Sequence, residues 1–433
     1  MHPRNVYNVQ PDFEKLAKEF PDFSELVTTE GSDRVYVDFK NPLVVKALCQ
    51  CLMKHDFNID IDFPMDSLCP AVPNRLNYIL WLEDIIKETV PDYQSSTKIK
   101  GIDIGVGASC IYPLLGCASN SNWSFLGTDI NERSIEYATN NIERNKLGDR
   151  IKLKLNKDPA SIFILDKKED YTFSMCNPPF YESKEELENG AQNKELEPSA
   201  ICTGSEQEMI TEGGEYAFIE TMIKESIKLK TRVRWYTSMM GLKRTIRPII
   251  RLLKQAEISN FVVTEFTQGK TVRWAIAWSF FPERVIKAYS LDFYRPRCQF
   301  DTILSKPISF VAKETLLILN DLEIQFEQEK ESSIIITGTV LQNTWSRAAR
   351  RQKKRQKLAH NEPKQQEQEE KREELFTFEF EIADITERSR CMTAIQGSWL
   401  KGKSRDIFEG FWSHFKKRIE QNCGLERGST FHS

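Results

Sequence analysis

Between residues 98 and 281, short apolar runs alternate with amphipathic stretches, and this alternation constrains the fold more than any other feature of the sequence. The first four runs have the length and the aromatic or β-branched content of buried strands, and they cover residues 99–104, 123–128, 151–155 and 171–176. Helices are predicted at 109–115 and at 131–145, where Asn131 is a candidate N-cap. Because strands that alternate with helices pack as a parallel sheet, we predict an α/β core.

The alternation continues to residue 281 and ends in a hairpin. The predicted elements are helices at 216–230 and 242–256, and strands at 233–238, 258–266 and 272–281. The last two strands flank Gln268-Gly-Lys270, a turn of hairpin type. We therefore predict a Rossmann-like core with a mostly parallel sheet of seven strands.

The fourth strand runs into Asn177-Pro-Pro-Phe180, the four residues that say most about function. Two prolines fix φ and remove two N–H donors, so the strand ends there. Ligands of open α/β sheets bind at the carboxyl ends of strands. The Asn177 amide and the Pro178 carbonyl can accept hydrogen bonds from an exocyclic amine, and Phe180 can stack on a flat base. A proline-rich turn with no function is the alternative.

The first strand leads into a glycine turn, Gly101-Ile-Asp-Ile-Gly-Val-Gly-Ala-Ser109. Its glycines permit close approach of a ligand, and the N-terminus of the following helix favours negative charge. The turn departs from the dinucleotide fingerprint, because Cys110 stands where a third glycine would fall. One βα unit later a strand ends at Asp129, whose carboxylate can accept hydrogen bonds from ribose hydroxyls or cap the next helix.

The composition limits the kinds of partner. With 433 residues and a net charge of −3, the chain can bind nucleic acid only through local basic patches. No apolar run is long enough to span a bilayer, and the amino terminus lacks the apolar segment of a secretory signal. The ten cysteines and five histidines are dispersed without zinc-site spacing. We expect an intracellular protein without a membrane partner and without a metal.

The length predicts more than one domain. Residues 1–95 read as a mainly helical extension, 96–282 as the core, and 283–304 as a linker. Residues 305–425 predict a small α+β domain, interrupted at about 346–374 by a stretch of low apolar content that we expect to be disordered.

Six segments together give the chain a resemblance to a known family. They are Met1-His-Pro-Arg-Asn5, Pro73-Asn-Arg-Leu-Asn-Tyr78, the glycine turn through Leu115, Cys176-Asn-Pro-Pro-Phe180, Glu212-Gly-Gly-Glu215 and Arg273-Trp-Ala-Ile-Ala-Trp-Ser-Phe280. Their order resembles the class I S-adenosylmethionine-dependent methyltransferases, and their combination is similar to the methyltransferase-like protein 16 family. That family comprises eukaryotic U6 snRNA adenine-N6 methyltransferases, related to bacterial 23S ribosomal RNA enzymes. The resemblance covers most of residues 1–281.

The resemblance implies roles for residues at the strand ends. S-adenosylmethionine is the implied cofactor, and its implied binding residues are Arg75, Asp103, Gly105, Gly107, Ser109, Asp129 and Asn177. The implied catalytic residues are Asn177, Pro178, Pro179 and Phe180. In the implied reaction, Asn177 and the Pro178 carbonyl hold the adenine amine while Phe180, with help from Tyr181, stacks on the flipped base. No metal and no histidine base take part.

The implied substrate is an unpaired adenine in structured RNA. U6 snRNA is the first candidate, and hairpins or splice sites of pre-mRNA, including S-adenosylmethionine synthetase transcripts, are further ones. Two alternatives remain open. The protein is an RNA-binding splicing regulator with secondary catalysis, or it methylates DNA adenine or protein glutamine, as enzymes with the related Asn-Pro-Pro-Tyr motif do.

Basic residues predict where the RNA lies. The candidates are Arg4, Arg232, Arg234, Lys243, Arg244, Arg347, Arg350, Arg351, Lys353 and Lys354. The run from Arg347 to Lys357 holds seven cations and no acid, which suits a nuclear localisation signal or an RNA-binding arm. We expect a monomer in the nucleus, with some in the cytoplasm, and an auxiliary RNA-binding role for the second domain.

Two loops are expected to regulate access to the site. The polar segment at 182–214 is longer than an ordinary connection and is predicted to be a mobile lid. Lys157 lies in a loop that, in relatives, can occlude the cofactor pocket, so autoinhibition is a further expectation from the resemblance.

Overall fold

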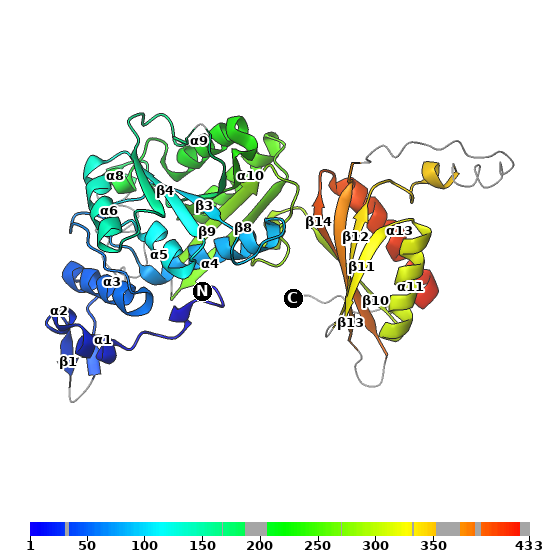
Figure 1. Ribbon diagram of the computed structural model, residues 1–433, viewed down its shortest axis with the longest axis horizontal. Helices are drawn as coiled ribbons and strands as arrows, with labels where there is room; N and C mark the ends of the chain where they lie inside the picture. The colour runs from blue at the N-terminus through cyan, green and yellow to red at the C-terminus, as the bar shows by residue number, and fades with distance from the viewer. Residues whose placement is uncertain are drawn as a thin grey trace. The chain divides into compact units, whose positions relative to one another are not determined.

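The structure, a computed structural model, describes residues 1–30, 34–166, 168–186, 206–269, 271–330, 333–351, 373–385 and 391–424. They form two compact units, coloured blue to green and yellow to red in Figure 1. The first unit holds Met1–Phe281 and Lys287–Arg295, and the second holds Pro282–Ile286 and Pro296–Ser433. The stretch at 283–304, predicted to be a linker, therefore contributes to both units.

The first unit is built on a seven-stranded sheet, which confirms the predicted fold class. Its order is β5-β4-β3-β6-β7-β9-β8. The strands are β3 (Ile99–Ile104), β4 (Trp123–Asp129), β5 (Ile151–Leu155), β6 (Tyr171–Cys176), β7 (Val233–Met240), β8 (Asn260–Gln268) and β9 (Thr271–Ser279). The first five are parallel, and β9 is antiparallel to both β7 and β8. From β3 the chain turns to β4 on one side and later enters β6 on the other, so the topological switch point lies at the carboxyl ends of β3 and β6.

The helices cover both faces of this sheet. They are α5 (Ile111–Ser119), α6 (Glu132–Arg144), α8 (Glu206–Met209), α9 (Gly214–Leu229) and α10 (Lys243–Gln255). The N-cap prediction for α6 is confirmed, because the Asn131 side chain accepts a hydrogen bond from the Ser134 N–H. In Figure 1, α9 and α10 lie on the opposite side of the sheet from α5.

The amino-terminal extension reaches the sheet through one long helix. Its elements are η1 (Val6–Asn8), α1 (Phe13–Glu19), α2 (Pro21–Ser24), β1 (Thr28–Glu30), β2 (Arg34–Tyr36), α3 (Pro42–Phe57) and α4 (Val72–Thr89). α4 packs against α5 and β8, and it buries Tyr78 and Trp81 completely. The Tyr78 hydroxyl lies 2.6 Å from Thr237 Oγ1 on β7, which ties α4 to the middle of the sheet.

An aromatic cluster fixes the strands that carry the switch point. Trp123, Phe125 and Phe173 pack with ring centroids 5.0–6.0 Å apart. Gly101 on β3 leaves the space these rings occupy, since a Cβ there would lie 2.4 Å from Phe173 Cζ. Dense packing on this scale resists movement, so β3, β4 and β6 keep their spacing.

The second unit is an α+β fold, as predicted. Its antiparallel sheet has the order β10-β14-β13-β12-β11, with β10 (Gln299–Leu304), β11 (Gln325–Lys330), β12 (Ile334–Val340), β13 (Phe376–Asp384) and β14 (Thr393–Gly402). The helices α11 (Ile308–Asp321) and α13 (Arg405–Cys423) pack together and against the sheet. Inward residues alternate with outward ones along β12 and β13, and the core is rich in aromatic rings.

Among the described residues, no helix is long and apolar enough to cross a membrane.

Candidate active site

The glycine turn after β3 forms one wall of a cavity. Gly105 and Gly107 have φ angles of +72° and +65°, which favour glycine. A Cβ at Gly105 would meet no heavy atom within 4 Å, so the conformation rather than crowding requires the glycine. The N–H groups of Gly105 and Val106 donate to the Thr128 carbonyl at 2.8 and 2.9 Å, which fixes the turn to the end of β4.

Asp129 braces this turn. Its Oδ2 accepts a hydrogen bond from the Gly107 N–H at 2.9 Å, and its Oδ1 accepts one from the Asn131 N–H at 2.9 Å. Burial raises the pKa of the carboxyl, and the hydrogen bonds from Asn131 and Gly107 oppose that rise. A carboxylate has about four acceptor positions, so acceptor capacity remains for a ribose hydroxyl. The carboxylate can therefore serve both the turn and a ligand.

Arg75 enters the cavity from the first turns of α4. Its Nη1 donates to the Tyr112 hydroxyl at 2.8 Å, and its guanidinium lies 5.4 Å from the centre of the Tyr112 ring. Burial raises the pKa of Tyr112 to about 12, so this hydroxyl stays neutral and donates onward to Met239 Sδ at 3.1 Å. The Arg75 Nε is buried and has no hydrogen-bond partner among the described residues. A guanidinium held in this way can still bind a carboxylate.

Asp103 differs from the other predicted cofactor residues. It is fully buried, and neither carboxylate oxygen has a hydrogen-bond partner in the described part of the chain. Burial raises its pKa well above the ordinary value, Asp129 adds to the rise, and Arg75 opposes it. It does not line the cavity, so its predicted contact with the cofactor has no direct geometric support.

The cavity has a volume of about 480 Å³ and lies at the switch point. Of the predicted cofactor residues it brings together Arg75, Gly105, Gly107, Ser109, Asp129 and Asn177. Apolar side chains also line the cavity, among them Ile130, Ile162 and Phe218. An arginine, an acid and an apolar surface suit the carboxylate, the ribose and the purine of S-adenosylmethionine.

Only two of the four residues in the Asn-Pro-Pro-Phe segment line the cavity. Asn177 and Pro179 line the cavity, whereas Pro178 and Phe180 do not. The Asn177 Oδ1 atom is buried and has no hydrogen-bond partner among the described residues. A buried acceptor without a partner costs about 1–3 kcal/mol, which marks it as a group that a ligand completes.

Phe180 is held by residues that the sequence analysis did not single out. A Cβ on Gly241 would lie 2.6 Å from Phe180 Cδ1, so only glycine leaves room for the ring at the end of β7. Arg273 lies 5.7 Å from the ring centre on β9. The buried Glu215 carboxylate accepts hydrogen bonds from the N–H groups of Gly241 and Leu242, and burial raises its pKa. The sequence signal that could have identified Gly241 is a glycine at the end of a strand.

The predicted lid is described only at its two ends. Residues 187–205 of this segment lie outside the described part of the chain. After the motif, Tyr181 pairs with the chain at Met209 and Thr211 through two backbone hydrogen bonds of 3.0 Å. This pairing brings Glu208 and residues 210–212 to the cavity wall. The described end of the segment is thus part of the wall, and lid motion remains a prediction.

The loop around Lys157 also lines the cavity. Asn156 and residues 159–162 contribute to the lining, whereas the exposed Lys157 does not. The Asn156 side chain donates to the Ser161 carbonyl at 2.6 Å, which closes this loop on itself. The loop therefore lies at the cavity. Its autoinhibitory role stays a prediction.

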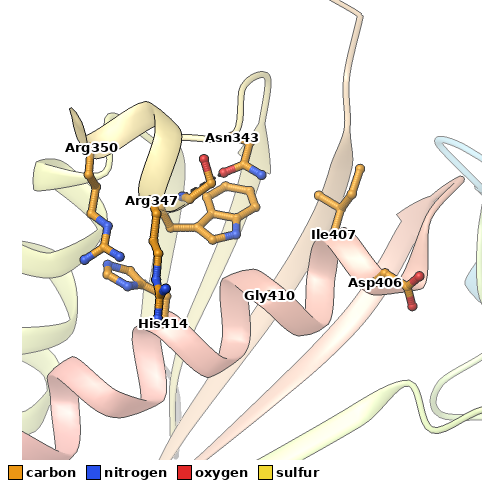
Figure 2. A pocket seen from close by; sticks show the side chains of 9 residues that line it. Asn343, Arg347, Arg350, Asp406, Ile407, Gly410 and His414 are labelled. Atoms are coloured by element: carbon orange, nitrogen blue, oxygen red, sulfur yellow. Dashed lines mark hydrogen bonds between the residues drawn. The ribbon is translucent and has the colours of Figure 1, made fainter. Parts of the chain in front are cut away.

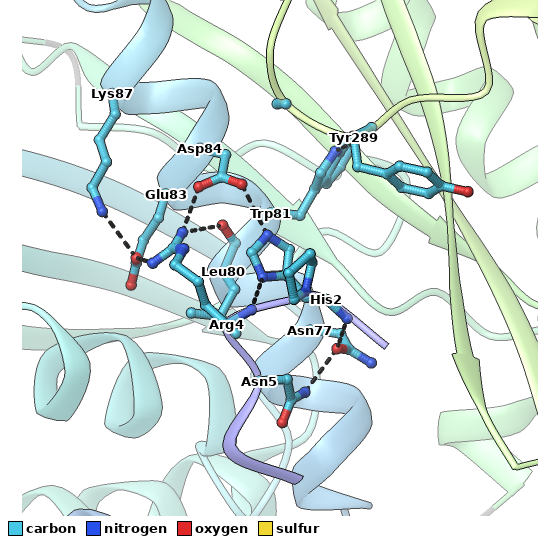
Figure 3. A network of polar contacts seen from close by, with 12 residues as sticks. His2, Arg4, Asn5, Asn77, Leu80, Trp81, Glu83, Asp84, Lys87 and Tyr289 are labelled. Atoms are coloured by element: carbon cyan, nitrogen blue, oxygen red, sulfur yellow. Dashed lines mark hydrogen bonds and ion pairs between the residues drawn. The ribbon is translucent and has the colours of Figure 1, made fainter. Parts of the chain in front are cut away.

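The predicted RNA contact at Arg4 is occupied by protein groups. Figure 3 shows the amino-terminal arm lying against α4, with Arg4 directed at two acids. Its Nη1 donates to Glu83 at 2.7 Å, and its Nη2 contacts Asp84 and donates to the Leu80 carbonyl. His2 lies 2.9 Å from the other Asp84 oxygen. These contacts account for Arg4 without RNA.

The other basic residues of the first unit do not form one track. Because β7 is parallel to β6, Arg232 and Arg234 lie at the amino ends of the strands, opposite Asn177. Arg232 donates to the carbonyls of Asp166 and Glu169 and pairs with Asp170 at 2.9 Å. Arg234 donates to the Thr89 carbonyl and lies 4.0 Å from the Phe281 ring centre. The structure therefore separates these two arginines from the site.

Lys243 and Arg244 instead follow the carboxyl end of β7, on the same edge of the sheet as Asn177. Arg244 pairs with Glu186, and the exposed Lys243 has no ion-pair partner among the described residues. In the second unit, Arg347, Arg350 and Arg351 are exposed, while Lys353 and Lys354 lie outside the described residues. These cations are close together in the sequence, but the fold places them at opposite edges of the sheet.

No group of three or more metal-ligating side chains occurs among the residues that the structure describes.

The sequence is similar to those of known RNA methyltransferases. A family model described as RNA methyltransferase matches residues 1–282. The RNA N(6)-adenosine-methyltransferase mettl16 of Xenopus laevis is 38% identical over 388 residues, which cover 82% of this chain and 69% of that protein. The human relative is 39% identical, and the match covers 60% of its length. The U6 small nuclear RNA (adenine-(43)-N(6))-methyltransferase of Drosophila melanogaster is 39% identical, with 65% of this chain and 94% of that protein covered.

Solved structures match the first unit. The human Mettl16 catalytic domain in complex with MAT2A 3′UTR hairpin 1 is 41% identical with a TM-score of 0.60, and covers 65% of this chain and 96% of that chain. The N-terminal domain of human METTL16 in complex with SAH is 40% identical with a TM-score of 0.55, and covers 65% of this chain and 99% of that chain. The chain thus spans about 60–69% of the vertebrate proteins named above and nearly all of the solved domains.

Proposed function

The chain belongs to the RNA methyltransferase family, and we propose that it transfers a methyl group from S-adenosylmethionine to N6 of an unpaired adenine in structured RNA. The single observation that carries the proposal is the buried Asn177 Oδ1, which faces no protein donor among the described residues and belongs to a residue lining the cofactor cavity.

The cavity residues fit the cofactor by charge and by hydrogen-bonding capacity. Arg75, with an unused Nε, would hold the carboxylate, and Asp129 would accept from the ribose hydroxyls. Gly105 and Gly107 would let the ligand approach the backbone. The relative solved with SAH supports this assignment, because SAH is the demethylated form of S-adenosylmethionine.

The task of the protein is to align the adenine amine. When bound, S-adenosylmethionine would supply an electrophilic methyl group and leave as the neutral thioether, while the surplus N6 proton would pass to water. Adenine N6 is a poor nucleophile because its lone pair is delocalised into the ring. The Asn177 Oδ1 and the Pro178 carbonyl would accept hydrogen bonds from the two N–H groups of this amine. These bonds would orient its lone pair toward the methyl group. Phe180, fixed between Gly241 and Arg273, would stack on the base.

The RNA substrate is proposed from the relatives. The Drosophila melanogaster relative is named for adenine 43 of U6 small nuclear RNA, and the human domain was solved with an mRNA hairpin. We propose both kinds of structured RNA as substrates. Extrusion of an adenine costs least where the base is unpaired, which favours loops and bulges over regular duplex.

A methylation assay with matched substrates tests this function. The full chain would be incubated with S-adenosylmethionine and one of four substrates: an RNA hairpin with an unpaired adenine, the same hairpin with guanine there, the DNA hairpin, and a glutamine-containing peptide. Mass spectrometry of the released nucleosides and deoxynucleosides, and of the intact peptide, should find an added methyl group only in the first reaction, as N6-methyladenosine. Methylation of the DNA or the peptide, with none on RNA, would contradict the proposal.

We further propose that the protein acts in the nucleus as a monomer. The seven cations between Arg347 and Lys357 and the small nuclear RNA of the relative's name support the location. A fluorescent fusion should lose nuclear enrichment when this run is neutralised. Light scattering of the purified chain should give the mass of one copy; a dimer mass would contradict the monomer.

A further inference from the structure

A buried carboxyl group lies beside the active site and outside the cofactor cavity. It belongs to Glu215, the second residue of α9, which is 1% exposed. Burial of a carboxyl group is unfavourable unless hydrogen bonds replace those lost to water. The groups that bind Glu215 therefore indicate what this side chain holds in place.

Glu215 forms its hydrogen bonds at the turn between β7 and α10. Its Oε2 atom accepts a hydrogen bond from the Gly241 N–H. The Leu242 N–H and the Thr245 hydroxyl also hydrogen-bond to the carboxylate. Leu242 is the N-cap residue of α10, and its own side chain makes no capping hydrogen bond. Glu215 therefore supplies, from α9, the acceptors that the first turn of α10 lacks.

The Phe180 ring packs against this turn. A Cβ on Gly241 would lie 2.6 Å from Phe180 Cδ1 and 3.0 Å from Phe180 Cε1, so the ring contacts the backbone that Glu215 holds. Phe180 is half-buried, so part of the ring stays open to a base. A shift of the turn would move the ring and change the direction in which this open part points.

Glu215 is also tied to the chain that directly follows Phe180. The preceding residue, Gly214, lies against that chain, because a Cβ on Gly214 would lie 3.7 Å from the Tyr181 carbonyl carbon. The Gly214 N–H donates to the Thr211 carbonyl at 2.9 Å, and the Thr211 N–H donates to the Tyr181 carbonyl at 3.0 Å. Glu215 thus joins the two segments between which the Phe180 ring is held.

We propose that Glu215 is a positioning residue for methyl transfer, because it holds the turn at Gly241 where the Phe180 ring can stack on the target adenine. The proposal rests on the proposed function, which gives Phe180 the role of stacking on the base. Glu215 acts through the turn and lies outside the cofactor cavity. Its loss should therefore lower the rate of methyl transfer and leave the affinity for S-adenosylmethionine unchanged.

Glu215→Gln tests this role at nearly constant shape. The amide keeps one acceptor oxygen and replaces the other with a donor that faces the N–H groups of the turn. In the full chain, the single-turnover rate on the RNA hairpin should fall about tenfold, the effect of losing one charge-assisted hydrogen bond. The Kd for S-adenosylmethionine, measured by calorimetry, should not change. Glu220→Gln is the matched control, because it removes the same charge from α9, where Glu220 pairs with Lys224 at 3.0 Å.

The position of the ring can be measured separately from the chemistry. A hairpin with 2-aminopurine at the unpaired position loses fluorescence when this base stacks on an aromatic ring. The bound hairpin should be brighter with Phe180→Ala than with the wild type, and brighter in part with Glu215→Gln. Added to Phe180→Ala, the Glu215 change should have no further effect, because the ring through which it acts is absent. Independent increases that add in the double variant would contradict the proposal.

Thr245→Val provides a test that keeps the carboxylate. It removes only the hydroxyl that binds Glu215, so the fold should persist even if Glu215→Gln does not fold. The methyl-transfer rate should fall by a smaller factor than in Glu215→Gln, again without a change in cofactor affinity. The fluorescence of the bound 2-aminopurine hairpin should rise in the same order.

The outcomes separate this role from the methyl-transfer proposal. If the wild type methylates the hairpin and both Glu215→Gln and Thr245→Val keep the wild-type rate and fluorescence, Glu215 does not position Phe180. A lower melting temperature at a normal rate would also overturn the proposal, since Glu215 would then only stabilise the fold. If the wild type binds the hairpin without methylating it, the proposed function fails, while the fluorescence still decides whether Glu215 orients the ring.

Discussion

The two cavities differ in whether their polar groups are buried or exposed. In the first unit, Arg75 and Asn177 line a cavity at the ends of packed strands and hold buried polar atoms that lack protein partners among the described residues. In the second unit, Arg347 and Arg350 hold exposed charges around an open groove beside α13 (Figure 2). Burial makes each unmet hydrogen bond costly and therefore specific, whereas exposed charge gives affinity without selectivity. The difference favours methyl-transfer chemistry at the first cavity, where each unmet hydrogen bond selects its partner.

The largest effect is expected from Asn177→Ala. The change removes the acceptor for the adenine amine, and loss of one such positioned group lowers kcat on the order of 10²–10³-fold. Cofactor binding, measured by calorimetry, should change little. Asn320→Ala, an exposed position on α11, is the matched control and should retain full activity. Near-normal turnover in the Asn177 variant would show that the buried acceptor of the first cavity does not contribute to catalysis.

The next effect is on cofactor affinity. Arg75→Ala removes a charged donor worth about 1.5–3 kcal/mol, so the Kd for S-adenosylmethionine should rise about 10–100-fold. Tyr112→Phe keeps the ring and removes only the hydroxyl that accepts from Arg75, so a smaller rise is expected. Calorimetry on both variants gives the order. A larger effect from Tyr112→Phe than from Arg75→Ala would show that the phenol contributes by some other route.

Gly241→Ala probes the placement of Phe180. The added Cβ would lie 2.6 Å from Phe180 Cδ1, and overpacking of this kind costs about 1–3 kcal/mol. We expect kcat to fall about tenfold with cofactor affinity intact. Gly148→Ala is the control, because a Cβ there meets nothing within 4 Å. Equal kinetics for the two variants would mean that the Phe180 ring does not contribute to turnover.

Arg232→Ala separates a structural arginine from an RNA-binding one. The side chain caps two carbonyls and pairs with Asp170 at the edge of the sheet far from Asn177. The variant should lose about 1 kcal/mol of stability, or about 2 °C in Tm, with no change in RNA affinity. A loss of RNA affinity at unchanged Tm would restore the RNA-binding role predicted for this residue from the sequence.

The smallest effect is on the pH dependence of stability. Burial lowers the pKa of His414, as do Arg350, Arg418 and Lys417, while Asp321 opposes them. Since the folded pKa lies below the unfolded one, the unfolded chain binds the proton first, and stability is lost as the pH falls through the unfolded value. The free energy of unfolding should therefore fall by about 1 kcal/mol or less between pH 7.5 and 5.5. His414→Asn should reduce that fall; an unchanged profile would show that His414 does not contribute to it.

The core of the fold could be predicted because its signals are local. The runs at β3 and β6 are apolar enough to be recognised as buried strands, and the predicted bounds of β3, β5 and β6 match the structure. The edge strands β10 and β11 were not predicted. β11 reads Gln-Phe-Glu-Gln-Glu-Lys, and a strand with one neighbour and a solvated face carries little apolar pattern.

The site was predictable where a residue type implies its chemistry. Arg75, Asp129 and Asn177 could be assigned because charge, acceptor capacity and position after a strand agree with the resemblance. Tyr112 and Gly241 could not, since their roles depend on neighbours more than thirty residues away in the chain. The positions of Arg232 and Arg234 could not be predicted, because sequence proximity does not tell which end of a strand a residue occupies; their RNA-binding role stays a prediction.

Single-turnover kinetics on two variants test the division between the cavities most directly. Methyl transfer to the hairpin would be measured at saturating RNA, beside the RNA Kd, for Asn177→Ala and for Arg347→Ala with Arg350→Ala. We expect a slow methyl-transfer rate with normal Kd for the first variant, and a normal rate with weakened binding for the second. A slow rate at saturating RNA in the arginine variant, or an intact rate in the Asn177 variant, would contradict this expectation.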